Sequence, residues 1–211
     1  MSAHSESSAA RRSIGTETRD RILAAARRVM LSHGLVRATT REIAHAAGVS
    51  EGTLYNHFAS KEELFLAALG QVPSGFFEII RGLRQRPEDE QVRTVLSELA
   101  RSGLEFYAEA IPMGASIFAD PRLLARHREL LASRGAGPQR ANEAVAAYLR
   151  AAQTRGNVRA DADPEAVAYM FLGALYQRVY WRQFLGEAEP ADGDERFITA
   201  LLDSLDRLLL P

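Results

Sequence analysis

Apolar side chains recur every three to four residues in the N-terminal part of the chain, which is the spacing of one face of an α-helix. The predicted helix runs from about Thr16 to Gly34, and its apolar face carries Ile22, Ala26, Val29 and Met30. Ahead of it, residues 1–15 are small and polar and have no such periodicity. We therefore expect residues 1–15 to form a disordered N-terminal arm.

Two short helices follow, and each begins with a side chain that can cap it. Thr39 starts a capping box, in which its hydroxyl accepts from an amide of the first helical turn. Gly48 can adopt the positive φ of a helix end, and Ser50 can cap a next helix over residues 51–58. A further capping box at residues 60–63 opens another helix. The pattern predicts a run of helices joined by tight turns.

The rest of the chain keeps helical periodicity and is divided by proline and glycine. Asp120-Pro121 and Asp163-Pro164 each place an N-cap acid before a proline of the first helical turn. No segment alternates polar and apolar residues for long enough to predict a β-strand. The expected fold class is therefore all-α, with about nine helices in total.

Charge is distributed unevenly along the chain, although the net charge is only −1. Residues 1–61 contain nine Arg or Lys against five Asp or Glu, whereas residues 62–211 contain 17 against 22. A basic N-terminal part joined to an acidic remainder is typical of a small nucleic-acid-binding module on a body that does not bind nucleic acid.

Composition and motifs disfavour several other classes. Cysteine is absent, so disulfides, thiolate zinc sites and thiol redox switches are excluded. The longest apolar run, residues 166–176, is shorter than the roughly 18 residues that a membrane-spanning helix needs. With no secretory signal either, a cytoplasmic protein is expected. A glycine-rich phosphate loop, an HExxH pair and a nucleophile elbow are also missing, so we predict no catalytic residue, cofactor or metal ion and no enzyme.

The helices around residues 39–58 have the arrangement of a helix-turn-helix, a DNA-binding motif. Such a motif needs small residues where its helices cross, a requirement that Ala44 and Ala47 meet. In the second helix, Leu54 and Phe58 are four residues apart and can anchor it to the core. The residues left to face DNA are Glu51, Gly52, Thr53, Tyr55, Asn56 and His57. On spacing alone, an ordinary helical hairpin explains the pattern equally well.

A set of segments between residues 18 and 64 follows a family pattern without gaps. These segments are TRDRILAAA at 18–26, GL at 34–35, ATTREIA at 38–44, AGVSEGTLYNHF at 47–58 and SKEEL at 60–64. They resemble the TetR family of transcriptional regulators. The resemblance implies a helix-turn-helix DNA-binding domain at 16–62 and a larger helical ligand-binding and dimerisation domain at 63–211. It also implies a repressor that a small molecule releases from a palindromic DNA operator.

The resemblance further implies which side chains contact DNA. The residues expected to bind phosphates are Thr40, Ser50, Tyr55, His57 and Lys61. The residues expected to face the bases are Arg41, Glu51, Gly52, Thr53 and Asn56. Glu51 has two interpretations, because its carboxylate could accept from a cytosine amino group or could simply favour the helix N-terminus.

Two apolar segments near the C-terminus look like the four-helix dimer interface of this family. Residues 166–176 are apolar nearly all round, and residues 197–209 carry a wide apolar stripe. The residues expected to contact a second copy of the chain are Phe171, Leu175, Val179, Ile198, Leu202 and Leu205. A purely intramolecular core is the alternative.

Aromatic and methionine side chains elsewhere in the C-terminal part are expected to line a cavity for a small apolar effector. The residues assigned to this cavity are Phe106, Met113, Phe118, Tyr148, Met170 and Tyr176. The expected partners are thus an operator of double-stranded DNA, a small-molecule effector and a second copy of the chain, with no membrane. The alternative is a DNA-binding protein of the same family without a ligand, acting as an architectural factor.

Overall fold

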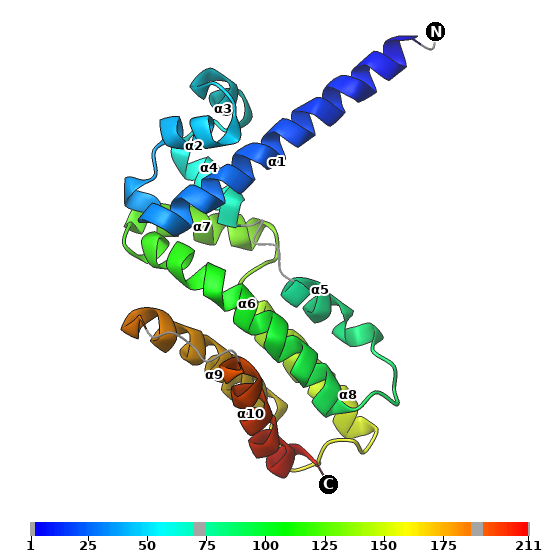
Figure 1. Cartoon of the computed structure of the whole chain (residues 1–211). Coiled ribbons are helices and arrows are strands. Elements are labelled where there is room, and N and C mark those ends of the chain that lie inside the picture. Colours follow the sequence, from blue (N-terminus) through cyan, green and yellow to red (C-terminus); the bar gives the residue numbers. More distant parts are fainter. Residues whose placement is uncertain (1–2, 70–74, 187–191, 211) are drawn as a thin grey trace. The chain divides into compact units, whose positions relative to one another are not determined.

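The computed structural model describes residues 3–69, 75–186 and 192–210. These residues form ten α-helices and one 3₁₀-helix, and none of them lies in a β-strand (Figure 1). The helices are α1 (Ala3–Arg37), α2 (Thr40–Ala47), α3 (Glu51–His57), α4 (Lys61–Leu69), α5 (Gly75–Gly82), η1 (Leu83–Gln85), α6 (Val92–Phe118), α7 (Pro121–Ser133), α8 (Gln139–Thr154), α9 (Pro164–Leu185) and α10 (Gly193–Leu209). The all-α prediction is confirmed. Among the described residues, no helix is long and apolar enough to cross a membrane.

The chain divides into two compact units. Unit 1 contains Met1–Val72 and Pro112–His127, and unit 2 contains Pro73–Ile111 and Arg128–Pro211. Helices α6 and α7 each contribute residues to both units. Unit 1 includes the predicted helix-turn-helix, whereas the predicted dimer helices belong to unit 2.

Helix α1 is longer at both ends than the sequence predicts. It begins at Ala3, within the segment expected to be disordered, and it ends at Arg37 rather than at Gly34. Its N-terminal turns extend beyond the helices packed on it (Figure 1). Residues 3–15 include three alanines and two arginines, which favour helix, and a helix that has nucleated propagates at little cost. Amphipathic periodicity reports burial, so its absence over these residues did not exclude a helical backbone.

Local capping closes the turns of the helix-turn-helix as predicted. At the start of α2, Thr39 Oγ1 accepts from the Glu42 amide at 3.2 Å. Gly48 ends α2 with a φ of +66°, a conformation that costs glycine least. At the start of α3, Ser50 Oγ accepts from the Thr53 amide at 3.0 Å. The orientation of α3 is therefore set by side chains that lie within or directly beside the motif.

Helix α4 begins with the predicted capping box and completes the core of unit 1. Ser60 Oγ accepts from the Glu63 amide at 3.1 Å, and the Glu63 carboxylate accepts from the Ala59 amide at 2.9 Å. The side chains that α1–α4 bury include Ile22, Leu23, Ala26, Met30, Ile43, Ala44, Leu54, Phe58, Leu64 and Phe65. Burying each large apolar side chain contributes about 1.5–3 kcal/mol. Because α3 has only seven residues, this packing rather than its own helix propensity holds it in place.

In unit 2, α8 and α9 lie side by side and contribute to one hydrophobic core with α5, α6 and α10. Asp163 caps α9 by accepting from two amides of its first turn, as the sequence predicts. Ion pairs join α6 to α10 at the rim of this core. Arg101 donates to both oxygens of Glu195 at 2.6 and 2.9 Å, and Arg93 donates to Asp203 at 2.7 Å.

The six residues assigned to a dimer interface lie in this intramolecular core instead. Phe171, Leu175, Val179, Ile198, Leu202 and Leu205 are each at most 3% exposed. Side chains that one chain already removes from water have almost no surface left to bury against a second copy. The apolar stripes of these two segments are wide enough to fill the core with one face and to leave a second apolar face exposed. Periodicity alone does not tell which of the two faces is buried.

Candidate nucleic-acid interface

Helix α3 turns one face to the core of unit 1 and the other to solvent. Leu54 and Phe58 are at most 1% exposed, in agreement with their predicted role as anchors. The exposed and half-exposed positions are Glu51, Gly52, Thr53, Tyr55, Asn56 and His57. The residues of α3 expected to face DNA are therefore accessible from solvent.

A hydrogen bond joins the two helices of the motif on their exposed side. The Tyr55 hydroxyl on α3 donates to Thr40 Oγ1 on α2 at 3.4 Å. Tyr55 is 48% exposed, and Thr40 is half-buried beside it. The fold thus brings together two of the predicted phosphate-binding hydroxyls from positions 15 residues apart. In this arrangement the Thr40 hydroxyl is the donor that remains for a phosphate group, and the Tyr55 hydroxyl becomes a second donor once it releases Thr40.

The hydroxyl of Ser50, another predicted phosphate contact, already has partners within α3. Ser50 Oγ accepts from the Thr53 amide and lies 2.9 Å from Thr53 Oγ1, so one of these hydroxyls donates to the other. One donor of the pair remains for an external acceptor. Beside them, a Cβ added to Gly52 would meet only Ser50 Oγ, at 3.7 Å. The backbone at Gly52 is therefore open to close approach by a ligand.

Cation–π contacts place two basic side chains beside the motif. Lys61 Nζ lies 5.1 Å from the centroid of the Phe65 ring, and Arg19 of α1 lies 5.0 Å from that of Phe58. Arg19 was not among the predicted DNA contacts, although it belongs to the TRDRILAAA segment. Arg41 on α2 is exposed. These three residues place positive charge on and beside the motif, which is the charge that attracts a phosphate backbone.

The residues assigned to an effector cavity have quite different environments. In unit 1, Met113 is 2% exposed whereas Phe118 is 75% exposed. In unit 2, Met170 is 49% exposed on α9, and Tyr148 lines a cavity beside α8. That one cavity is lined by all six stays a prediction, because helical periodicity marks apolar residues without telling which of them share a space.

Phe106 and Tyr176 do come together, in an aromatic cluster of unit 2. The aromatic cluster consists of Phe76, Phe77, Phe106, Tyr107 and Tyr176. Tyr107 lies between the two predicted residues, with ring centroids 5.3 Å from Phe106 and 5.6 Å from Tyr176. Burial, and to a smaller degree the nearby Tyr176, raises the pKa of Tyr107 to about 12. Its hydroxyl therefore stays protonated and can donate to a ligand at neutral pH.

Helix α9 also exposes an apolar face away from the core of unit 2. This outer face of α9 consists of Tyr169, Met170, Tyr180, Trp181 and Phe184, which are 41% to 75% exposed. Gly173 lies among them, and nothing is within 4 Å of a Cβ added there. Leu208 of α10 is also 50% exposed. An apolar surface of this extent is typical of a protein–protein contact.

Two family models match the chain, one in each half. Residues 22–68 match the model of bacterial regulatory proteins of the tetR family, and residues 128–200 match the C-terminal domain of AefR-like transcriptional repressors. The chain belongs to the TetR family. The first match contains the whole helix-turn-helix of α2 and α3, so this family assignment covers the candidate nucleic-acid interface.

Individual TetR-family proteins are similar to this chain over stretches of different length. The HTH-type transcriptional repressor AcnR of Corynebacterium glutamicum is 36% identical over 95 residues, which cover 41% of this chain and 50% of AcnR. The match thus spans about half the length of that relative. The HTH-type transcriptional regulator UidR of Escherichia coli K12 is 29% identical over 167 residues, covering 75% of this chain and 78% of UidR. The crystal structure of a TetR-family regulator from Mesorhizobium loti superposes with a TM-score of 0.74 at 22% identity, over 93% of this chain and 98% of that one.

Proposed function

We propose that this TetR-family chain is a transcriptional repressor that binds a palindromic DNA operator as a homodimer and is released by a small molecule. The observation that carries the proposal is the exposed hydroxyl pair of Tyr55 and Thr40, which links α3 to α2 on the solvent side. The name of AcnR, a transcriptional repressor, supports the same function for the matched N-terminal region.

Phosphate contacts would fix α3 in the major groove. Thr40 opens α2, where the free amides of the first turn add further hydrogen-bond donors. Tyr55 and His57 of α3 would donate to the same DNA strand, together with the hydroxyl left available at Ser50. Lys61, at the first position of α4, would add a charged contact. These contacts position the protein without reading sequence.

Base reading would then fall to the remaining exposed residues of the motif. Asn56 can form two hydrogen bonds with adenine, and Arg41 can form two with guanine. Gly52 would let the backbone come close to the base edges, and Thr53 would present its methyl or hydroxyl group beside it. Glu51 would either accept from a cytosine amino group or only stabilise the start of α3.

A second copy of the chain would pack on the outer face of α9 and on Leu208. In a twofold dimer the same patch of each subunit meets its own copy, so an apolar face on one long helix is self-complementary. Gly173 would allow the two copies of α9 to approach closely. This surface replaces the buried residues that the sequence assigned to the interface.

A small apolar effector would bind at the aromatic cluster of unit 2. Its rings supply apolar area, and the protonated Tyr107 hydroxyl supplies a polar contact for orientation. Operator half-sites read by such dimers are about 34–36 Å apart or a multiple of that distance. An effector that prefers a conformation with another spacing would weaken operator binding, typically by 1–3 kcal/mol of coupling or about 5–150-fold.

In vitro selection from random DNA duplexes tests the DNA-binding function. We expect enrichment of a palindromic sequence, whose affinity fluorescence anisotropy then measures. No enrichment, or enrichment of a site without twofold symmetry, would contradict the proposal. The effector part is tested by screening compounds for thermal stabilisation and measuring operator affinity with each. Compounds that bind the chain but never change its operator affinity would contradict release by a small molecule.

A further inference from the structure

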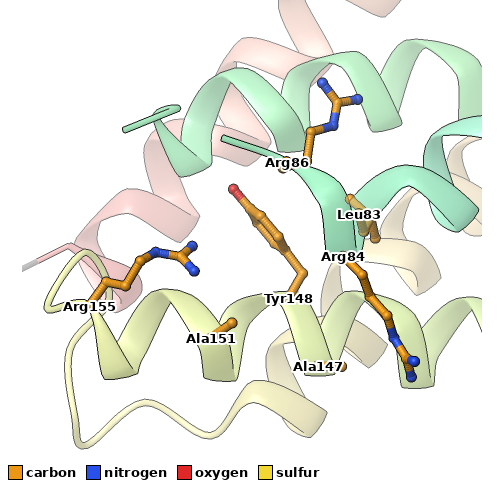
Figure 2. A pocket seen from close by; sticks show the side chains of 7 residues that line it. All are labelled: Leu83, Arg84, Arg86, Ala147, Tyr148, Ala151 and Arg155. Carbon is orange, nitrogen blue, oxygen red and sulfur yellow. The ribbon is translucent and has the colours of Figure 1, made fainter. Parts of the chain in front are cut away.

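Unit 2 contains a cavity between η1 and the C-terminal half of α8, and it is lined by none of the residues of the aromatic cluster. Its volume is about 330 Å³, near the lower end of the range for small-molecule sites. The residues that line it are Leu83, Arg84, Arg86, Ala147, Tyr148, Ala151 and Arg155 (Figure 2). The lining contains three arginines and no acidic residue, so an anion is the charged ligand that suits it.

Tyr148 provides an unused donor at this cavity. The residue is 6% exposed, and its hydroxyl has no hydrogen bond within the described part of the chain. Figure 2 shows the ring rising from α8 with its hydroxyl directed away from the helix. The pKa of Tyr148 is raised, mainly by burial and to a smaller degree by the negative charge of Glu90. The positive charges of Arg155 and Arg86 act in the opposite direction. The hydroxyl therefore stays protonated at neutral pH and can donate to an acceptor bound in the cavity.

The three arginines differ in what neutralises them. Arg86 forms ion pairs with Glu90 at 3.2 Å and with Glu98 at 2.6 Å. Arg84 and Arg155 have no carboxylate partner within the described residues. In Figure 2 the Arg155 side chain extends toward the tyrosine ring, whereas the guanidinium groups of Arg84 and Arg86 point away from it. Arg155 is therefore the cation best placed to bind an anion, because it is close and has no counter-ion.

The remaining surface of the cavity is apolar. Leu83 is 3% exposed and forms part of the core, and Ala147 and Ala151 are one turn apart on α8. A fully hydrated inorganic ion would gain nothing from these methyl groups. A ligand with a charged head and a small apolar body would use both kinds of surface.

We propose that this cavity binds a small organic anion, with its carboxylate or phosphate head on Tyr148 and Arg155 and its apolar body on the methyl groups of Ala147 and Ala151. The site is independent of the DNA-binding function, and it takes a different class of compound from the apolar effector. Arg84, which is exposed at the edge of the cavity, attracts the anion by its charge.

Isothermal titration calorimetry on the full chain at low ionic strength tests the site. The probes are benzoate, phenyl phosphate, inorganic phosphate and benzyl alcohol, which has a similar apolar body and no charge. We expect saturable binding of benzoate or phenyl phosphate, and which of the two binds more tightly identifies the head group. Benzyl alcohol is expected to bind at least about tenfold more weakly, because it lacks the charge-assisted hydrogen bonds. Equal binding of benzyl alcohol, or binding of inorganic phosphate alone, would overturn the assigned class.

Three variants locate the binding within the chain. Tyr148→Phe keeps the ring and removes only the hydroxyl, and Arg155→Gln removes an exposed charge, so both are expected to fold normally by circular dichroism. Each should weaken binding of the organic anion by about fivefold to tenfold. Arg128→Gln, which removes another exposed arginine outside the cavity, should leave binding unchanged. Binding unaffected by Tyr148→Phe and Arg155→Gln, or weakened equally by all three, would overturn the proposal whether or not the chain binds an operator.

Discussion

At the scale of single residues, DNA affinity and DNA specificity are expected to depend on different side chains. Tyr55→Phe removes the hydroxyl that meets Thr40 and leaves the ring in place. If this hydroxyl donates to a phosphate, operator and non-operator duplexes should both bind about tenfold more weakly in fluorescence anisotropy. Tyr148→Phe, the same change in unit 2, should leave both affinities unaltered. A loss confined to the operator would show instead that Tyr55 reads bases.

Lys61 is the single lysine of the chain, and its ammonium group lies over the Phe65 ring. Lys61→Ala should weaken binding to all DNA sequences and lower the slope of log affinity against log salt by about 1. Lys61→Arg should retain most of the slope, because it keeps the charge. If the slope of Lys61→Ala equals that of the wild type, Lys61 only packs on the ring and contacts no phosphate.

At the scale of the element, the turn between α2 and α3 depends on the positive φ of Gly48. Nothing lies within 4 Å of a Cβ added there, so Gly48→Ala tests backbone strain without a steric clash. It should lower the free energy of unfolding by about 1–2 kcal/mol, measured by urea denaturation. Gly114→Ala in α6, where nothing lies within 4 Å either and φ is not positive, should be neutral or stabilising. An equal change in the free energy of unfolding for the two substitutions would contradict the expected strain at Gly48.

The elements of the helix-turn-helix could be predicted from the sequence because the signals that define them are local. Thr39, Gly48 and Ser50 act on amides and dihedral angles within a few residues of themselves, and each has its predicted role in the structure. The start of α1 could not be predicted in this way, because its N-terminal turns have no apolar face to reveal them. The hydrogen bond from Tyr55 to Thr40 could not be predicted from neighbouring residues either, because it depends on how two helices cross.

At the scale of the whole molecule, assembly and folding are expected to depend on opposite faces of α9 and α10. Phe184→Glu changes a side chain that is 75% exposed on the outer face of α9. The variant should keep its circular dichroism spectrum and sediment as a monomer, because only a dimer would bury the new charge. Phe118→Glu changes an equally exposed phenylalanine in unit 1 and should remain dimeric. Leu202→Glu, at 2% exposure, should lose several kcal/mol of stability and unfold.

A dimeric Phe184→Glu variant, or a wild-type monomer at micromolar concentration, would contradict the proposed interface. The sequence placed the dimer contact on these two helices, which stays a prediction, whereas the six residues it named on them are buried in the core of one chain. Both α9 and α10 carry more apolar positions than one core contact needs, so which face meets α6 and α8 depends on the packing of the entire unit. Of the residues assigned to the effector, Phe106 and Tyr176 share one aromatic cluster, and which of the others join them could not be predicted because a cavity is defined by side chains from several helices at once.

Trp181 is the only tryptophan of the chain and is 58% exposed on the outer face of α9. Indole fluorescence from this protein therefore has a single origin, and its emission wavelength reports one environment without any added label. Diluting a dimer that covers this face should shift the emission to the red as the indole meets water, so the dissociation constant can be followed optically at low concentration. Quenching by iodide should increase over the same range of dilution, and Phe184→Glu should show the red-shifted, easily quenched signal at every concentration.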